Sequence, residues 1–548
     1  MRFPGTFRSA LVGAVAVGGL AALAGCTART NVGATGAAPP DIAHLWVTVD
    51  ELWFADAADT LPESATGWTR RTLSDPVVID LANVDPGTLV PLVSNLSVAA
   101  GNYRQLHLGI ADSSERLVAA ARAVGLEYNA QVDLVEDDGT ITKAPLELPV
   151  PGAGLTIPVD LSFEDDSGSG GTDSAAGDVT NLAITLDAAR DVVTYEYGAN
   201  TGYILSPSAS VDDVAAAGEI RGSVDTRGLP EDHPAITVSA QVEDGNGTRH
   251  VVVQRRGVAS DGSFSLYPLP AAKKGGTLYD VVIACAGADT VIVRDVPVND
   301  DGAVTTLQST PVVLTPASTV YADLAVRSTA LPAGTRVEFH QTLAGRGDLP
   351  YVIDGTAVDP LTRQLPGEKF ALASGSLVEG NHAGGDAISF ATATPAEGSG
   401  SYLVGSTGPY RADTLETDPV AVTGSSRDPS LVVAPLPEIA EGGRSAALAV
   451  TILVPAGSFN RGFVTVGAGH RVVETASVDT LLERGGGVIT IIGLPAGSAL
   501  APAAGVPYQV ALRAWNSRNA SGTITRVAGA ASATLGDGGV GAVSLRIQ

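Results

Sequence analysis

The histidines and serines of the chain are tested first for chemistry, because a hydrolase needs a nucleophile, a base and an orienting group held together. The seven histidines are spread over four regions, and none has the His-x-His or His-Glu-x-x-His spacing of a zinc site. The Gly-Ser-Gly-Ser run at 398–401 lacks the strand-to-helix turn that exposes a nucleophilic serine. The sequence therefore predicts no catalytic residues, and His107 and His340 are expected to be hydrogen-bonded residues of strands.

Two acidic turns are the best candidates for a metal ion, which would be calcium. Asn299-Asp300-Asp301-Gly302 and Glu136-Asp137-Asp138-Gly139 each place several oxygen ligands in a tight turn, as a hard cation prefers. Neither turn has the twelve-residue spacing and closing Glu of an EF-hand. Side-chain-capped hairpin tips explain both turns equally well. We therefore expect no metal and no cofactor.

Cys26 is the residue with the clearest predicted chemistry. It follows a leader in which Arg2 and Arg8 precede an apolar stretch, 10–24, that is too short to span a bilayer. Leu23-Ala24-Gly25-Cys26 resembles the lipobox of bacterial lipoproteins. The resemblance implies that residues 1–25 are removed as a signal peptide, that the Cys26 thiol carries a diacylglyceryl group, and that the new N-terminus is acylated. Several acyl chains make a durable membrane anchor.

The residues after the leader predict where the anchored protein lies. Thr27 stands where an Asp would resemble an inner-membrane retention signal, so the outer membrane is favoured if the host is Gram-negative. Residues 26–40 are small and polar and end in prolines, which predicts a flexible tether. An ordinary secretory signal that happens to contain a cysteine is the alternative. Cys285 is expected to be a small buried hydrophobic residue.

Composition limits the classes of partner and fold. The chain has 548 residues, 45% of them hydrophobic, which is enough to build several cores and excludes wholesale disorder. Removing the two leader arginines from 33 basic residues leaves 31 against 59 acidic ones, a charge of −28. Nucleic-acid backbones require clustered Lys and Arg, so a nucleic-acid partner is not expected.

The local pattern predicts an all-β chain. Segments such as 45–49, 182–186 and 488–491 alternate as strands do, and Asp-Gly pairs at 138, 244, 261, 301, 354 and 537 are typical of hairpin turns. One short helix is expected, with Ser114 as N-cap and Gly125 as stop. Trp46 and Trp53 lie seven residues apart, so an unbroken strand would place them on opposite faces. Trp515 is expected in a core.

The region 41–210 carries a family resemblance. A Val-rich strand at 47–52 is followed by Val-Ile-Asp-Leu at 78–81, Ala-Gly-Asn-Tyr-Arg-Gln-Leu-His-Leu at 100–108, Leu-Asp-Ala-Ala at 186–189 and Tyr-Ile-Leu-Ser-Pro at 203–207. In this order they resemble the bacterial domain of unknown function 4382, which is typically carried by lipoproteins. His107 stands where that family usually has Arg, and the family implies no established activity. The acidic Gly/Ser stretch 164–178 inside the region is expected to be a disordered surface loop.

A second resemblance begins at residue 217. Gly-Glu-Ile-Arg-Gly-Ser-Val at 218–224, Asp-Gly-Ser-Phe-Ser-Leu at 261–266 and Tyr-Asp-Val at 279–281 resemble the carboxypeptidase regulatory-like β-sandwich, a non-catalytic module covering 217–316. A similar Leu-Pro turn followed by a Tyr-led strand recurs at 494–508, which predicts a C-terminal sandwich over 436–548. Residues 317–435 are expected to be a β-rich, sandwich-like region.

Together these patterns predict tandem β-sandwiches behind a lipid anchor. We expect a non-catalytic protein of the bacterial envelope that presents or binds a ligand, an extracellular or periplasmic protein or glycan, through its loops. A periplasm-facing structural component is the first alternative. A surface hydrolase is the second, because catalytic residues on sandwich loops leave no local signature. The oligomeric state does not follow from the sequence.

Overall fold

The computed structural model describes residues 27–546 with interruptions, and the account below is confined to those residues. The positions within that range that are not described are 39–41, 59, 63, 65, 86, 137, 151, 165–178, 189–191, 198–199, 230–234, 273–274, 286, 300–301, 318–334, 346–348, 358–376, 399, 409–413, 416–417, 422–443, 497–505, 518–523, 527–530 and 536–538.

The first part of the chain forms an N-terminal sandwich, residues 27–213, which is all-β as predicted but begins before the predicted boundary at residue 41. Its strands are β1 (Thr27–Ala37), β2 (Ile42–Ala55), β3 (Trp68–Asp80), β4 (Val90–Ala99), β5 (Gly101–Ile110), β6 (Gln131–Val135), β7 (Ile141–Glu147), β8 (Leu155–Phe163), β9 (Val179–Asp187), β10 (Val192–Tyr197), β11 (Asn200–Leu205) and β12 (Ser208–Asp213).

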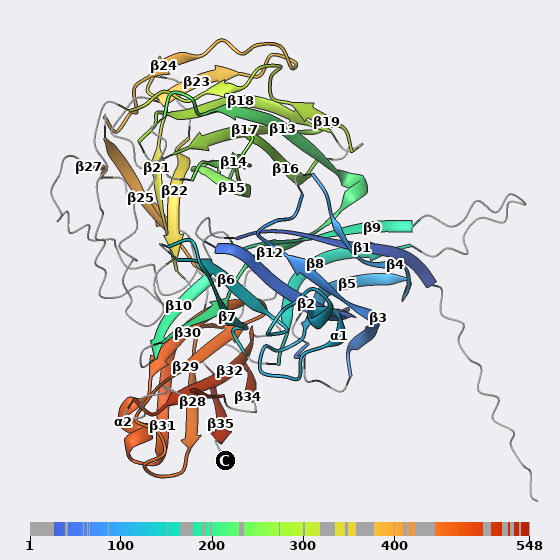
Figure 1. Cartoon of the computed structure of the whole chain (residues 1–548), viewed down its shortest axis with the longest axis vertical. Helices are drawn as coiled ribbons and strands as arrows, with labels where there is room; N and C mark the ends of the chain where they lie inside the picture. Colours follow the sequence, from blue (N-terminus) through green and yellow to red (C-terminus); the bar gives the residue numbers. More distant parts are fainter. Residues whose placement is uncertain are drawn as a thin grey trace, which may run out of the picture.

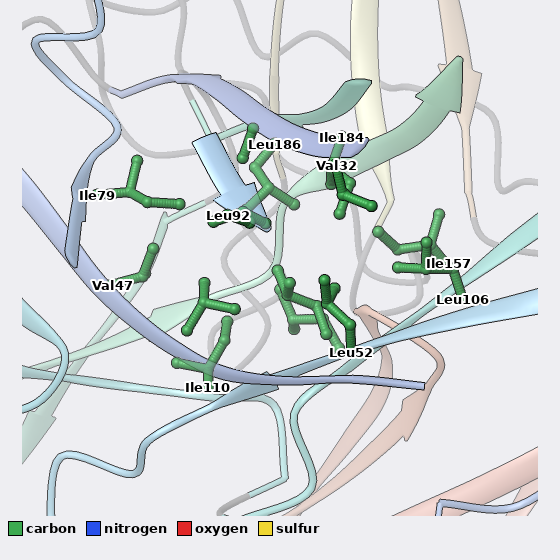
Figure 2. Packing of buried hydrophobic residues seen from close by; sticks show 14 of the residues in the cluster. Val32, Val47, Leu52, Ile79, Leu92, Leu106, Ile110, Ile157, Ile184 and Leu186 are labelled. Carbon is green, nitrogen blue, oxygen red and sulfur yellow. The ribbon is translucent and has the colours of Figure 1, made fainter. Parts of the chain in front are cut away.

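Two sheets of this N-terminal sandwich face each other across one core. The first has the order β12-β9-β1-β4, and the second has the order β10-β11-β7-β6-β2-β5-β8 with β3 paired to β2 (Figure 1). Apolar side chains of both sheets interdigitate, among them Val32 and Ile184 from the first and Leu52, Leu106 and Ile157 from the second (Figure 2). Burial of these side chains is the main stabilising term of the sandwich.

The predicted flexible tether is wrong, because Thr27–Ala37 is strand β1. This strand lies inside its sheet, antiparallel to β4 (Thr27 opposite Ala99) and parallel to β9 (Arg29 opposite Val179). Ala28, Val32 and Ala34 are buried. Two hydrogen-bonded neighbours satisfy the backbone of β1, so small side chains are sufficient to hold it in the core.

A β-bulge overturns the prediction that Trp46 and Trp53 face opposite sides of their strand. The register of β2 against β5 shifts between Val49 and Glu51, which leaves Asp50 as the extra residue. The buried positions accordingly change parity, from Leu45, Val47 and Val49 before the shift to Leu52 and Phe54 after it. One extra residue reverses the alternation, so both tryptophans lie half-buried on the outer face.

A second sandwich follows, and it extends beyond the predicted boundary at 316. Its sheets have the orders β16-β13-β19, with β20 on β13, and β15-β14-β17-β18-β23-β24. The strands β23 and β24 come from the region 317–435, and Ile388 of that region lies in the same core. The strands are β13 (Ala217–Asp225), β14 (Thr237–Glu243), β15 (His250–Gly257), β16 (Ser263–Pro270), β17 (Thr277–Ala284), β18 (Thr290–Val298), β19 (Val304–Thr306), β20 (Val312–Val313), β23 (Leu377–Asn381) and β24 (Ala391–Ala393).

The rest of the middle region forms a sheet of its own with the order β22-β21-β25-β26 and β27 on β25. The C-terminal sandwich has the sheets β31-β28-β35 and β30-β29-β32-β33, with β34 on β32, around a separate apolar core. These strands are β21 (Arg336–Gln341), β22 (Tyr351–Ala357), β25 (Ser401–Thr407), β26 (Thr414–Leu415), β27 (Val420–Ala421), β28 (Arg444–Leu453), β29 (Arg461–Ala468), β30 (Arg471–Ser477), β31 (Gly486–Ala496), β32 (Val506–Trp515), β33 (Ile524–Arg526), β34 (Ala531–Leu535) and β35 (Val540–Arg546).

Two local predictions are corrected by the fold. The helix α1 (Ala119–Ala123) is shorter than expected, and Ser114 does not cap it, because the Ser114 N–H and hydroxyl donate to Asp112. The Asp354-Gly355 pair lies inside β22 and is not a hairpin turn. The remaining helical segments among the described residues are η1 (Val214–Ala216) and α2 (Asp479–Glu483).

Candidate functional site

The predicted lipidation site, Cys26, lies outside the described residues, but its neighbour Thr27 is the first residue of β1. We use the name Thr27 end for the end of the N-terminal sandwich at which β1 and β9 begin, β4 turns into β5 at 99–101, and β8 finishes at Phe163. Register places these strand ends together, since Thr27 pairs with Ala99 and Gly101 pairs with Phe163.

The opposite end of the N-terminal sandwich contacts the C-terminal sandwich through a buried ion pair. The Arg513 guanidinium on β32 donates from Nε to Glu147 Oε2 on β7 over 2.5 Å. Its other nitrogens donate to the Leu148 carbonyl at 2.7 Å and to the Thr465 hydroxyl at 2.9 Å. The two charged side chains are 2% and 8% exposed. A buried pair of this kind stabilises only when its remaining donors and acceptors are satisfied, as they are here.

Aromatic residues surround this ion pair. The Tyr195 hydroxyl donates to Glu147 Oε1 at 3.0 Å, and its ring packs edge-on against Phe463 of the C-terminal sandwich. Burial first, and the Glu147 charge second, raise the pKa of Tyr195. Trp515 lies in the same cluster, so it is buried as predicted, but between two sandwiches.

A second joint connects the second sandwich to the end of β1. Arg256 on β15 donates to the carbonyl of Gly36 and, at 3.1 Å, to the Thr35 hydroxyl. Burial lowers the pKa of Arg256 below its ordinary value, and the nearby Asp187 opposes that effect. Thr35 and Gly36 lie eight and nine residues beyond Thr27, at the other end of the strand.

A third joint holds the middle sheet against the second sandwich. His250 stacks on Tyr351 with ring centroids 3.9 Å apart, and its Nε2 lies 3.3 Å from Asp280 Oδ2. The Tyr351 hydroxyl donates to the same carboxylate at 2.8 Å. Although burial alone raises the pKa of Asp280, the bonds from His250, the Asp295 amide and Tyr351 hold it below its ordinary value. A His-Asp-Tyr set is thus part of a domain interface.

His44 and Asp80 form the most exposed histidine–carboxylate pair. His44 Nδ1 lies 2.7 Å from Asp80 Oδ2, and the His44 side chain is 38% exposed. Asp80 also accepts hydrogen bonds from the backbone amides of Leu45 and Ala82 and from Asn83 Nδ2. Its carboxylate therefore fixes β2, the end of β3 and the turn that follows. This explains the Asp of the Val-Ile-Asp-Leu motif structurally.

The predicted strand histidines lie in strands and are buried. His107 on β5 stacks on Trp53 at 4.4 Å, and its Nδ1 lies 2.9 Å from the Thr156 hydroxyl. His340 on β21 is fully buried, with Nε2 3.6 Å from Glu338 Oε2. Burial first, and the Arg70 charge second, lower the pKa of His107 to about 3. A neutral His107 is suited to packing between the sheet and the tryptophan.

The predicted calcium turns are not brought together with other ligands in the described part of the chain. Asp138 accepts hydrogen bonds from the Thr140 amide and hydroxyl, which lower its pKa and cap the β6–β7 hairpin. Asp137, Asp300 and Asp301 lie outside the described residues, whereas Glu136 and Asn299 border them. Among the described residues there is no group of three metal-ligating side chains and no helix long and apolar enough to cross a bilayer.

The Gly-Ser-Gly-Ser run precedes a strand, not a helix. Gly398 lies in a turn closed by hydrogen bonds to Pro395 and from Ser401, and Ser401 begins β25, while Ser399 lies outside the described residues. This context lacks the turn into a helix that a nucleophile elbow needs.

Sequence reasoning missed the joint residues. Glu147 and Arg513 are 366 positions apart, so no local spacing connects them. The available signal was an arginine in β32, a strand that is apolar apart from Gln509 and Arg513 and whose residues from Tyr508 to Trp515 are all buried.

Comparisons with known proteins characterise one part of the chain. No curated protein matches it. Among solved structures, BcpA, the major pilin subunit of Bacillus cereus, is 12% identical, with 60% of this chain and 99% of that chain covered and a TM-score of 0.12. At that TM-score nothing about this fold follows from the likeness. Residues 27–207 match the family described as Domain of unknown function (DUF4382), and this match spans the N-terminal sandwich from β1 to the end of β11.

Proposed function

We propose that the protein is a lipid-anchored, non-catalytic component of the bacterial cell envelope that presents or binds a ligand through the loops of its sandwiches. The observation that carries the proposal is the use of buried charged groups at joints. The Glu147–Arg513 pair and the Arg256 contacts hold separate sandwiches together. A rigid scaffold with outward loops is an arrangement typical of presentation and binding.

The anchor in this proposal is Cys26 acylated at its thiol, preceded by a signal peptide over residues 1–25. Its support is the charged and then apolar leader that ends at Leu23-Ala24-Gly25-Cys26. We place the protein in the outer membrane, because Thr27 follows the cysteine. The ligand belongs to the class of extracellular or periplasmic proteins and glycans.

Within this proposal, residues 217–316 are a carboxypeptidase regulatory-like module. Its support is a pair of facing sheets around one core in which Ile220, Phe264, Tyr279 and Val281 of the quoted motifs are all buried. Such a module positions its neighbours and brings no catalysis. A periplasm-facing structural component remains the first alternative, and a surface hydrolase the second.

Substitution of the anchoring cysteine tests the proposal. Cys26→Ala is expected to move the protein from outer-membrane fractions to the soluble fraction, or to leave it uncleaved in the inner membrane. Cys285→Ala is the matched control, since Cys285 is a buried side chain of the second sandwich, and it should leave fractionation unchanged. Mass spectrometry of the purified N-terminus checks acylation directly. Flotation of Cys26→Ala with outer membranes would contradict the proposal.

The alternatives are separated by two further assays. A protease too large to cross the outer membrane, added to intact cells, cleaves a surface-facing protein and spares a periplasm-facing one. A panel of hydrolase substrates tested on the purified protein gives turnover only if the hydrolase alternative holds.

A further inference from the structure

We propose that the N-terminal sandwich stands end-on between the bilayer and the other domains, with its Thr27 end against the lipid headgroups. This inference rests on the proposed anchor at Cys26 and adds the orientation that the anchor imposes. The partner surface is a phospholipid bilayer. The first ground is chain length, because a single peptide bond separates Cys26 from the first residue of β1.

The absence of a spacer at this point follows from pairing within the sheet. Thr27 is opposite Ala99 of β4, and Arg29 is opposite Val179 of β9, so β1 is held from its first residue. A flexible tether of fifteen residues would let the domain turn freely, whereas an acylated residue directly before a paired strand keeps that strand end at the membrane. The strand ends that share this position, at 99–101, Phe163 and Val179, are held there with it.

The second, independent ground is the position of the joints. Arg256 contacts Thr35 and Gly36 at the far end of β1. His470 of the C-terminal sandwich lies 3.1 Å from the carbonyl of Thr156, near the start of β8. The strand ends that meet the other sandwiches are therefore opposite those that follow the anchor. Eight residues of strand at about 3.3 Å each separate the two ends by about 25 Å.

The exposed side chains at the Thr27 end are polar, which favours contact with lipid headgroups and disfavours insertion into the hydrocarbon layer. Thr27, Arg29, Asn102 and Arg104 are exposed there, and the Arg104 guanidinium pairs with the Asp160 carboxylate. These groups hydrogen-bond with headgroups and water and do not favour burial in hydrocarbon. In Figure 1 the starts of β1 and β9 point to the right, whereas the C-terminal sandwich lies below and strands β13–β18 lie above. The other sandwiches thus lie away from the anchored end, on the side of the joints.

Short-range fluorescence quenching tests the orientation. The full-length protein, matured in cells and reconstituted in phospholipid nanodiscs, is labelled with a small thiol fluorophore at Asn102→Cys or at Asn246→Cys. Both asparagines are exposed; Asn102 lies at the Thr27 end, and Asn246 lies at the hairpin tip of β14 and β15, ten positions before Arg256 of the joint. Native thiols do not interfere, because Cys26 is acylated, and Cys285 is buried with a pKa raised to about 11.

Lipids that carry a nitroxide on the headgroup should quench the label at 102 severalfold more strongly than the label at 246. Ser97→Cys, an exposed position opposite Arg29, is a second near site should Asn102→Cys fail to fold. Equal quenching at both positions, or stronger quenching at 246, would overturn the orientation. A protein that lacks acyl chains by mass and does not enter nanodiscs overturns the anchor itself, and this outcome is seen before any quenching is measured.

Discussion

At the scale of one residue, His107 is a histidine that serves packing: it is buried in the sheet and stacks on a tryptophan. Its neighbours in space are Trp53, Trp68 and Thr156. His107 is 2% exposed. Burial and the Arg70 charge both disfavour the imidazolium, so the folded state holds His107 neutral.

The free energy of unfolding should therefore decrease as the pH falls, because His107 takes up a proton more readily in the unfolded state. Its pKa is about 3 when folded and about 6.5 when unfolded, so the unfolded state binds more protons between those values. Above pH 6.5 His107 is neutral in both states and costs no stability. As the pH falls from 6.5 toward 3 the free energy of unfolding decreases, by about 2 kcal/mol at pH 5. Urea unfolding at pH 7 and pH 5 measures the loss, and His107→Gln should lack this part of it.

His382→Gln provides the control for that experiment, because His382 lies half-buried at the surface with its Nε2 3.2 Å from the Thr306 carbonyl. It should keep the full pH dependence of the original protein. An identical pH dependence in the original protein and in His107→Gln would show that His107 does not titrate as described.

At the scale of elements, β1 explains why a strand resembles a tether in sequence. Glycine is required at two positions of β1, because neighbouring side chains occupy the space that a larger residue would need. A Cβ on Gly36 would lie 2.4 Å from Leu81 Cδ2, and one on Gly33 would lie 2.9 Å from Leu89 Cβ. A rule that assigns small polar segments to linkers cannot distinguish this case, since the crowding comes from residues far along the chain.

The bulge in β2 gives an element-scale prediction at Gly109. This residue is opposite Glu51, and a Cβ there would lie 2.7 Å from Glu51 Cβ and 3.2 Å from the Glu51 amide nitrogen. Gly109→Ala should lower the free energy of unfolding by about 1–3 kcal/mol, the cost of overpacking. Urea unfolding followed by tryptophan fluorescence measures it. Gly257→Ala, where a Cβ meets no atom within 4 Å, should change stability by less than about 0.5 kcal/mol, and equal losses in both variants would refute the explanation.

At the scale of the whole molecule, the Glu147–Arg513 pair joins the N-terminal sandwich to the last. Arg513→Ala leaves a buried carboxylate without its cation and should cost about 3–5 kcal/mol at the joint. Loosening of the C-terminal sandwich should then appear as a larger radius of gyration in small-angle X-ray scattering of the purified protein, and as a lower urea midpoint.

Arg461→Ala is the matched control for the joint. Arg461 also pairs with a carboxylate, Asp479 at 2.6 Å, but its side chain is 53% exposed. Solvent screens such a pair, so its removal should cost less than about 1 kcal/mol and leave the radius of gyration unchanged. Equal effects of Arg513→Ala and Arg461→Ala would mean that the buried pair does not hold the two sandwiches together.

The sequence alone determined the class of the fold, because alternation of apolar residues is a local property that a strand expresses wherever it lies. It also determined the motifs of the N-terminal family domain and the burial of Cys285. Only the tertiary structure decided the place of β1, the shared outer face of Trp46 and Trp53, and the strands that cross the boundary at 316. It likewise decided the joints, since Glu147 and Arg513 meet across 366 residues. Such contacts depend on which sheets face each other, and no local spacing encodes that.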